Sequence, residues 1–165
     1  LINQHRAHLR ILYDKYIKQF DLHKGLSQTL MFPASLYLDN EQKFLFFELG
    51  DELQTLGFGF NTDGDDILIT SIPVDTTTKK PEDLIIELIS LSKEFKDQSK
   101  KVLSENFALK IAKSVSIPEG QMLSIDEMEN IVTELMECKE FKYTPEGKLI
   151  VSIVTPDDIR KHFEN

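Results

Sequence analysis

The sequence predicts an α+β fold, because five or six segments of helical periodicity accompany one hairpin and one β-branched run. The clearest helical stripe lies within residues 9–20, and the hairpin pattern lies within residues 58–72. A chain of 165 residues is long enough for one core, or for two lobes that share a chain path. The middle third of the chain is expected to form its own lobe of helices and a hairpin.

Composition narrows the class of protein further. The chain is 41% hydrophobic, carries a net charge of -9 and contains one cysteine, Cys138. A folded protein of a reducing compartment fits these values, whereas a disordered chain, a disulfide framework or a multi-cysteine zinc site does not. No apolar run approaches the ~20 residues of a membrane span, and residues 1–5 lack the zones of a signal peptide.

The charge is unevenly distributed. Residues 1–33 carry five basic and two acidic side chains, so only this segment has a basic excess. The rest of the chain is strongly acidic and should repel phosphate backbones. We therefore expect weak or no direct DNA binding by this chain alone.

The N-terminal third begins with two apolar residues, Leu1 and Ile2, that look like the end of a strand, so we expect a fragment of a longer protein. A helix follows, with apolar side chains at the i, i+3, i+4 and i+7 positions. These residues are Leu9, Leu12, Tyr13, Tyr16, Ile17 and Phe20. Residues 27–33 are short, apolar and closed by Pro33, which predicts an edge strand or an extended peptide.

A second helix is predicted after Asp39 and Asn40, continuous to Leu56 and ended by Gly57. Two strands should then flank the acidic segment 61–66, whose Asp-Gly pair suits a hairpin turn. This segment resembles a calcium loop only superficially, because Gly64 is misplaced for one, and the hairpin is the favoured interpretation.

The C-terminal half is predicted to be mainly helical. Residues 73–80 should form a flexible connection, followed by helices over 81–96 and 99–116. Ser124 and Glu127 form a capping-box pattern at the start of another helix, and residues 155–163 should form a closing helix after a proline. The capping-box helix is expected to turn Met128, Ile131, Val132 and Leu135 inward. Residues 149–154 are β-branched enough to predict a buried strand.

Few residues suggest chemistry by themselves. His5 and His8 lie three residues apart and could share a metal ion, although a capping or solvated role is the more ordinary one. Cys138 has Lys139 beside it but no nearby histidine to act as its base, so a nucleophilic role is less favoured. The chain contains no phosphate-binding glycine loop, nucleophile elbow or paired-cysteine motif.

The segment that ends at Pro33 has the form Gln-x-Leu-x-x-Pro. Peptides of this form dock on the bacterial sliding clamp, where an amide side chain hydrogen-bonds at a cleft and apolar residues fill a pocket. The predicted clamp-binding residues are Gln28, Leu30, Met31, Phe32 and Pro33. Taken by itself, this short pattern favours an edge strand over a clamp-binding peptide.

Taken together, residues 3–14 and the Gln-x-Leu-x-x-Pro segment resemble the C-terminal domain of the mismatch-repair protein MutL. The order of later elements also fits, through residues 111–116, Gly120, residues 143–148 and the closing helix. The resemblance implies a dimer-forming, cytoplasmic and nucleoid-associated bacterial module that is joined to an ATPase outside this chain. It also implies a dimerisation lobe of residues 1–34 and 104–165, with a regulatory lobe of residues 35–103 inserted into it.

Many members of the resembled family nick DNA with a zinc or manganese site. Their motifs are DQHA-x-x-E-x-x-x-x-E, an Ala-Cys pair and Cys-Pro-His-Gly-Arg. This chain departs from the motifs at most ligands, because a leucine, a lysine and a threonine replace anionic or thiolate donors. The positions concerned are Asn3, Gln4, His5, Leu9, Asp14, Lys113, Thr144 and Glu146.

The sequence therefore predicts a module without nuclease activity, cofactor or metal. Its expected partners are a second copy, the sliding clamp and, through the full-length protein, a mismatch-recognition protein and a separate nicking enzyme. The dimer interface should be built or supported by Ile131, Leu135, Leu149, Val151 and Ile153. Two alternatives remain open: a metal-dependent endonuclease with a divergent ligand set, with a residual site at His5, Asp14 and Glu146, and a regulatory scaffold unrelated to repair.

Overall fold

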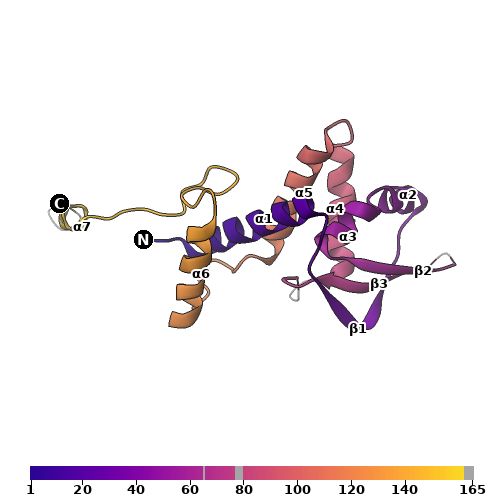
Figure 1. Cartoon of the computed structure of the whole chain (residues 1–165), viewed down its shortest axis with the longest axis horizontal. Helices are drawn as coiled ribbons and strands as arrows, with labels where there is room; N and C mark the ends of the chain where they lie inside the picture. Colours follow the sequence, from indigo (N-terminus) through magenta and orange to yellow (C-terminus); the bar gives the residue numbers. More distant parts are fainter. Residues whose placement is uncertain (65, 77–79, 162–165) are drawn as a thin grey trace. The chain divides into compact units, whose positions relative to one another are not determined.

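A computed structural model describes residues 1–64, 66–76 and 80–161. Helices and a small sheet make up the described chain, as the predicted α+β class requires (Figure 1). The elements are α1 (Gln4–Leu22), β1 (Ser27–Leu36), α2 (Asn40–Glu48), α3 (Gly50–Leu56), β2 (Gly59–Asp63), β3 (Asp66–Pro73), α4 (Pro81–Glu94), α5 (Lys100–Val115), α6 (Ile125–Glu137) and α7 (Pro156–Lys161). No helix in the described residues is long and apolar enough to cross a membrane.

The chain divides into two compact units. Unit 1 comprises residues 1–11 and 116–165, and unit 2 comprises residues 12–115. Unit 1 is thus built from both ends of the chain, with unit 2 inserted between them. The boundaries of the dimerisation and regulatory lobes that the sequence suggests are drawn elsewhere, at residues 34 and 104, and stay a prediction.

Unit 2 contains a three-stranded antiparallel sheet in the order β1-β3-β2. The predicted hairpin is confirmed as β2 and β3, and its strands extend further into the acidic segment than expected, to an Asp63–Asp66 pair. Gly64 supplies the positive φ of 58° that the turn needs. The predicted edge strand is confirmed as β1, whose one partner strand among the described residues is β3.

Helix α4 contacts α5, α2, β1 and β3. The core of unit 2 consists of large apolar side chains with almost no exposure, including Phe46, Phe58, Phe107, Leu53 and Ile69. The predicted flexible connection 73–80 lies partly in the described chain, where Val74 and Asp75 form a turn and Thr76 is buried. Residues 77–79 of that connection lie outside the described residues.

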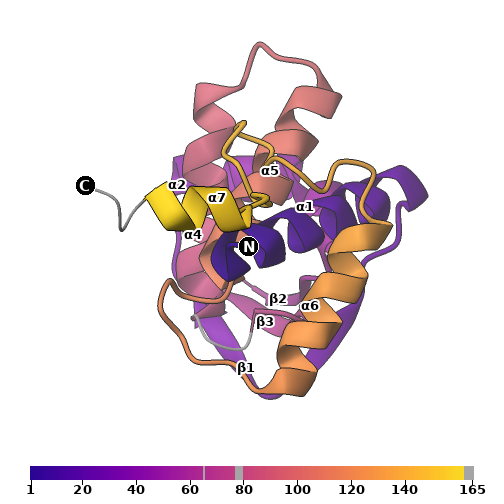
Figure 2. The same cartoon turned by 90° about the vertical axis from the view of Figure 1, so that its left-hand side faces the viewer.

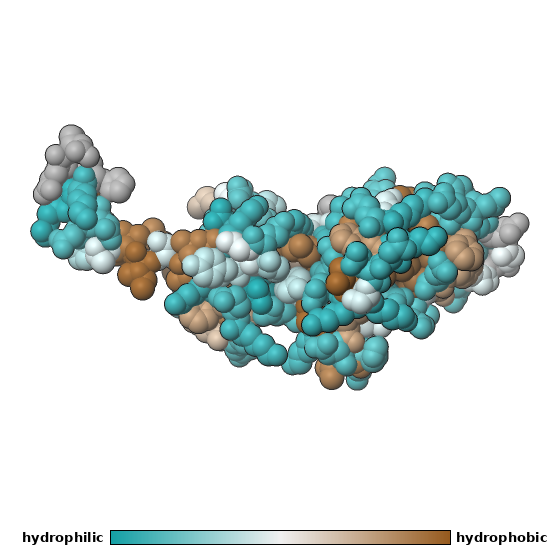
Figure 3. All heavy atoms as spheres, turned by 90° about the horizontal axis from the view of Figure 1, so that it is seen from above, coloured by the Kyte–Doolittle hydropathy of each residue, from teal (hydrophilic) through white to brown (hydrophobic). Residues whose placement is uncertain are grey.

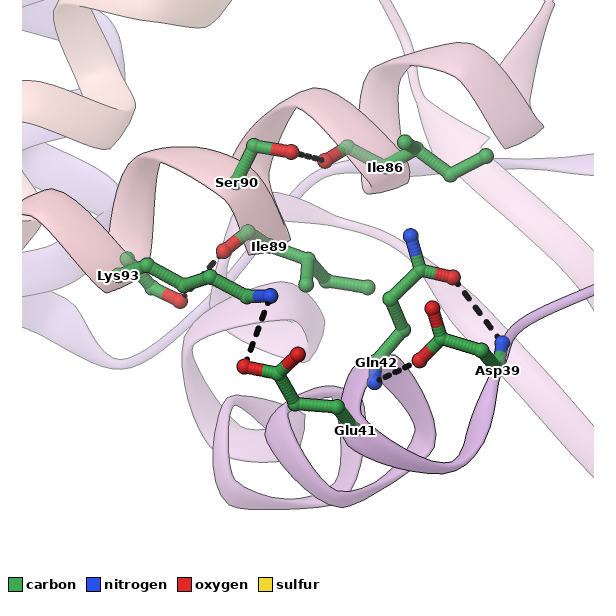
Figure 4. A network of polar contacts seen from close by, with 8 residues as sticks. Asp39, Glu41, Gln42, Ile86, Ile89, Ser90 and Lys93 are labelled. Atoms are coloured by element: carbon green, nitrogen blue, oxygen red, sulfur yellow. Dashed lines mark hydrogen bonds and ion pairs between the residues drawn. The ribbon is translucent and has the colours of Figure 1, made fainter.

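The prediction of one continuous helix from after Asn40 to Leu56 is wrong, because two helices meet at Leu49. Leu49 has φ -91° and ψ 7°, which ends α2, and α3 begins at Gly50. Glycine weakens a helix interior and permits such a change of direction. The start of α2 carries a capping box between Asp39 and Gln42, and Lys93 of α4 pairs with Glu41 at 2.9 Å (Figure 4).

Unit 1 has a smaller core, in which α6 crosses the first turns of α1 (Figure 2). The predicted capping box at the start of α6 is confirmed, with Ser124 and Glu127 bonded reciprocally. The core cluster consists of Ala7, Ile11, Ile131, Leu135 and Ile150. Its aromatic neighbour, Phe141, is only partly buried.

The predicted buried strand over residues 149–154 is wrong. Only isolated bridges form there, between Ile2 and Val151 and between Tyr143 and Leu149. Ile150 is buried, whereas Ile153 is 88% exposed. The β-branched composition favours extended backbone, but the contacts of this segment in the described chain are isolated bridges and the two hydrogen bonds between Leu1 and Ser152, which do not make a strand.

Candidate functional site

The Gln-x-Leu-x-x-Pro segment bulges out of the edge strand β1. Thr29 pairs with Ser71 and Ala34 pairs with Ile69, so residues 30–33 stand against the single residue Thr70. The ladder is interrupted over this stretch, which we call the β1 bulge. A bulge at a sheet edge redirects side chains and ends regular pairing.

The side chains of the β1 bulge are presented to solvent. Met31 is 88% exposed and Phe32 79% exposed, while Leu30 is half-buried. Gln28 lies just before the bulge, opposite Ile72, and is exposed. Two large apolar side chains exposed on a strand edge form a surface that suits an apolar pocket on another protein. The structure thus groups the five predicted clamp-binding residues on one exposed edge, and their partner stays a prediction.

His5 and His8 both contact the backbone of Ile117. The Nδ1 of His5 lies 2.8 Å from the carbonyl oxygen of Ile117, and the backbone N–H of Ile117 donates to Nδ1 of His8 at 3.0 Å. A carbonyl only accepts and a backbone N–H only donates, so His5 presents a protonated Nδ1 and His8 an unprotonated one. The two imidazoles hold the segment after α5 against α1, a role that the sequence did not reveal.

Asn3, Gln4 and Leu9 occupy positions of the family's nuclease motif, and in this structure each has a structural role at the start of α1. Asn3 accepts a hydrogen bond from the backbone N–H of Arg6 at 3.0 Å, which caps the helix. Gln4 donates to the carbonyl oxygen of Gln121, and Leu9 is 4% exposed, within the core. A residue buried among apolar side chains cannot present a ligand to a surface ion.

Residues 144–148 correspond to the family's Cys-Pro-His-Gly-Arg motif, and they form a tight turn. The N–H of Thr144 donates to the carbonyl oxygen of Lys148 at 2.8 Å, and the Thr144 hydroxyl accepts from the Lys148 N–H at 3.1 Å. Gly147 has a φ of 79°. The buried Thr144 therefore has its hydroxyl committed to the turn, while Glu146 is exposed.

The remaining positions of the motif belong to unit 2. Asp14 lies on α1 and Lys113 in the last turn of α5, where Lys113 adds a positive charge. Among the residues that the structure describes, no three histidine, cysteine or acidic side chains are grouped so that they could hold a metal ion. The absence of a metal and of catalysis stays a prediction.

Of the four α6 residues that are predicted to face inward, two are buried and two are exposed. Ile131 and Leu135 are buried in the core of one chain, so they can support a partner surface without forming it. Met128 and Val132 were expected to be buried but are 46% and 40% exposed. These two side chains stay exposed because the apolar stripe of α6 is wider than the part of the helix surface that α1 covers.

The other three predicted interface residues lie in the extended segment 149–154. Leu149 is 43% exposed, Val151 is half-buried and packs on the core cluster, and Ile153 is exposed. Arg6, which the sequence did not single out, donates to the carbonyl oxygen of Leu149 at 2.7 Å. Hydrophobic surface gathers on the segment that leads to α7 (Figure 3).

The electrostatics at the start of α6 are local. The backbone and hydroxyl of Ser124 donate to Glu127, at 2.7 and 2.8 Å, and hold the pKa of that carboxyl below its ordinary value of 4.5. The charged form of Glu127 is therefore part of the cap.

Comparison with known proteins shows similarity to one family. Residues 1–123 match a family model described as the MutL C terminal dimerisation domain. The chain is 33% identical over 165 residues to the DNA mismatch repair protein MutL of Phocaeicola vulgatus, covering 99% of this chain and 26% of that protein. The MutL of Bacteroides fragilis is 31% identical over 164 residues, again 99% of this chain and 26% of that protein. The chain thus spans about a quarter of the length of these relatives.

Proposed function

Because this chain belongs to the family of MutL C-terminal dimerisation domains, we propose that it is the homodimeric C-terminal module of a bacterial mismatch-repair protein that docks on the sliding clamp and lacks nuclease activity. Its similarity to MutL proteins over 99% of the chain supports the role in repair. The β1 bulge is the observation that carries the docking role.

Clamp docking is supported by the way in which the β1 bulge is presented. Its apolar side chains, Met31 and Phe32, are mostly exposed, and the interrupted ladder leaves their backbone out of regular pairing. An extended peptide of this kind binds through side chains in pockets and through its free backbone groups. Gln28 stands at the start of the segment, where its amide can donate and accept.

The docking role is tested by pull-down and titration with purified sliding clamp. The double substitution Gln28→Ala with Leu30→Ala should weaken binding on the order of a hundredfold, because an apolar anchor and an amide contact are lost together. Thr29→Ala is the matched control, since Thr29 is exposed on the same strand and belongs to no clamp position of the motif. Unchanged binding by the double variant would refute this docking site.

The lack of a nuclease site is supported by the donors that the chain offers. Leu9 is buried in the core, the hydroxyl of Thr144 is used in a turn, and Lys113 brings a repelling charge. The Nδ1 atoms of both His5 and His8 engage Ile117. A hydrolytic metal site needs about three protein ligands and an open position for water.

The nuclease alternative predicts a clear result with supercoiled plasmid, manganese and clamp. We expect no nicking by this chain above the background of buffer alone. Nicking that disappears on His5→Ala would contradict the proposal and favour a divergent ligand set. Since His5→Ala also removes the contact with Ile117, a melting curve of the variant must accompany the assay.

Other partners follow from the same proposal. A second copy holds two ATPase arms together, and contacts with the mismatch-recognition protein and with a separate nicking enzyme belong to the full-length protein. The dimerisation lobe corresponds to residues 1–34 and 104–165, and the regulatory lobe to residues 35–103.

A further inference from the structure

The β1 bulge is attached to the sheet on both sides. After the bulge, Leu36 pairs with Ile67, and both side chains are buried. Before the bulge, Gln28 pairs with Ile72 near the end of β3. Residues 30–33 themselves have no regular ladder, so these two flanks decide where the exposed side chains of the bulge stand.

The flank before the bulge packs closely against the end of α3. We call residues 25–28 the β1 entry. A Cβ on Gly25 would lie 2.6 Å from both the backbone nitrogen of Gly57 and the carbonyl oxygen of Thr55, and a Cβ on Gly57 would lie 2.5 Å from the carbonyl oxygen of Leu26. These distances are shorter than van der Waals contact, so only glycine fits at both positions. One side of the β1 entry is thus fixed by direct packing of backbone on backbone.

The other side of the β1 entry is formed by the end of β3 and the turn that follows it. The N–H of Val74 donates to the carbonyl oxygen of Leu26 at 3.3 Å. In the turn, the N–H and the hydroxyl of Thr76 both donate to the carbonyl oxygen of Pro73, at 3.0 and 2.7 Å, and Thr76 is buried. A displacement of this turn would therefore move the β1 entry with it.

Asp75, inside this turn, is bound by helix α1. Its Oδ2 accepts a hydrogen bond from Nζ of Lys15 at 2.6 Å, and the two side chains are only 27% and 33% exposed. Water therefore screens this ion pair only in part. The next residue of α1, Tyr16, is fully buried, and its pKa is raised by that burial and by the carboxylate of Asp75. Tyr16 stays neutral, and Lys15 supplies the positive charge that pairs with Asp75.

We propose that Lys15 and Asp75 are positioning residues for clamp docking: their ion pair anchors the turn after β3 to α1, and through the β1 entry the turn sets the place of Gln28. This inference rests on the proposed docking role and adds to it two residues outside the Gln-x-Leu-x-x-Pro segment. A segment whose flank is anchored loses less conformational freedom on binding than a loose one, so it binds more tightly.

The anchor is tested by titrating purified sliding clamp with the 165-residue chain. Asp75→Lys places a second cation beside Lys15 and should weaken clamp binding on the order of tenfold. The swap Lys15→Glu with Asp75→Lys restores opposite charges and should return the affinity to within about threefold of the unaltered chain. Glu87→Lys is the matched control, because it reverses an ion pair of unit 2 with Lys110, at 3.2 Å, that joins α4 to α5. It should leave the affinity unchanged.

A second measurement reads the β1 entry in the free chain. Hydrogen exchange of peptides that cover residues 24–29 should be faster in Asp75→Lys and should recover in the swap, while peptides of α4 and α5 exchange as before. A melting curve accompanies each variant. Asp75→Asn, which removes the charge without adding one, serves if Asp75→Lys does not fold, and it should weaken binding by about threefold.

The outcomes separate this inference from the docking role. If Gln28→Ala with Leu30→Ala loses clamp binding while Asp75→Lys and Asp75→Asn keep it, the anchor is wrong and the docking role stands. The anchor is equally wrong if Glu87→Lys weakens binding as much as Asp75→Lys, because the effect would then be a general loss of stability. An unaltered chain without affinity for the clamp would refute the docking role and this inference with it.

Discussion

The two units differ in how completely one chain buries their apolar side chains. In unit 2, the rings of Tyr16, Phe46, Phe58 and Phe107 are fully buried. In unit 1, the core cluster contains only aliphatic side chains and an alanine, while α6 and the C-terminal segment keep large apolar residues exposed. Exposed apolar surface of this extent marks an interaction site. Unit 2 therefore has a large aromatic core within one chain, although Met31 and Phe32 at its sheet edge are exposed, whereas unit 1 has a small core and is expected to gain stability from a partner.

The largest expected effect is in the core of unit 2. Phe107→Ala should cost about 3 to 5 kcal/mol of unfolding free energy, because a fully buried ring of α5 leaves a cavity. Hydrogen exchange measured by mass spectrometry should show faster exchange throughout the sheet and α4. Phe44→Ala, at a ring that is 62% exposed, should change stability by less than about 0.5 kcal/mol.

Leu135→Ala makes the corresponding test in unit 1. We expect a cost of about 2 to 3 kcal/mol, at the low end for a buried leucine, because the small core around it can relax. The exchange of α6 peptides should rise, while unit 2 peptides remain protected. A loss of protection in both units together would show that they unfold as one and would break the comparison.

A smaller effect is expected at the edge of unit 2, where α2 begins (Figure 4). Asp39→Ala removes the side chain that accepts from the Gln42 N–H at 2.8 Å and should cost about 1 kcal/mol in thermal unfolding. Glu41→Ala removes the exposed ion pair with Lys93 and should cost less than about 0.5 kcal/mol, an effect that fades in high salt. Equal costs for the two variants would contradict this ranking.

The smallest effect is local and concerns pH. The pKa of Glu127 lies below its ordinary value, mainly because the Ser124 backbone donates to the carboxylate. Its stabilising contribution is therefore present above about pH 4.5 and is lost as the pH falls through the lowered pKa. Amides at the start of α6 should exchange faster under those acidic conditions. Glu127→Gln should abolish this pH dependence, and a dependence that survives would refute the assignment.

The sequence predicts best those features that neighbouring residues decide. The helix α1, the hairpin at Gly64 and the capping box of α6 all depend on residues within a few positions, and each is confirmed. The break at Leu49 escapes prediction because the apolar pattern continues across it, and only Gly50 marks the weakness.

Longer-range features were harder to predict. The β-branched run 149–154 has strand propensity, yet a strand forms only where a partner lies beside it over several residues, and the described residues make isolated bridges there instead. The shared engagement of His5 and His8 with Ile117 joins residues over a hundred positions apart. The sequence likewise predicts the apolar stripe of α6. It does not show that α1 buries Ile131 and Leu135 and leaves Met128 and Val132 exposed, because that depends on how the two chain ends pack.

All four methionines of the chain are exposed and lie in two places. Met31 is in the β1 bulge, Met128 and Met136 are on α6, and Met122 precedes α6. Oxidation of a thioether to the sulfoxide makes an apolar side chain polar and is reversed by dedicated reductases. Peroxide would therefore reach these exposed side chains before it reached either core, which contains no methionine. Mild oxidation should make these parts of the surface more polar and leave the fold intact.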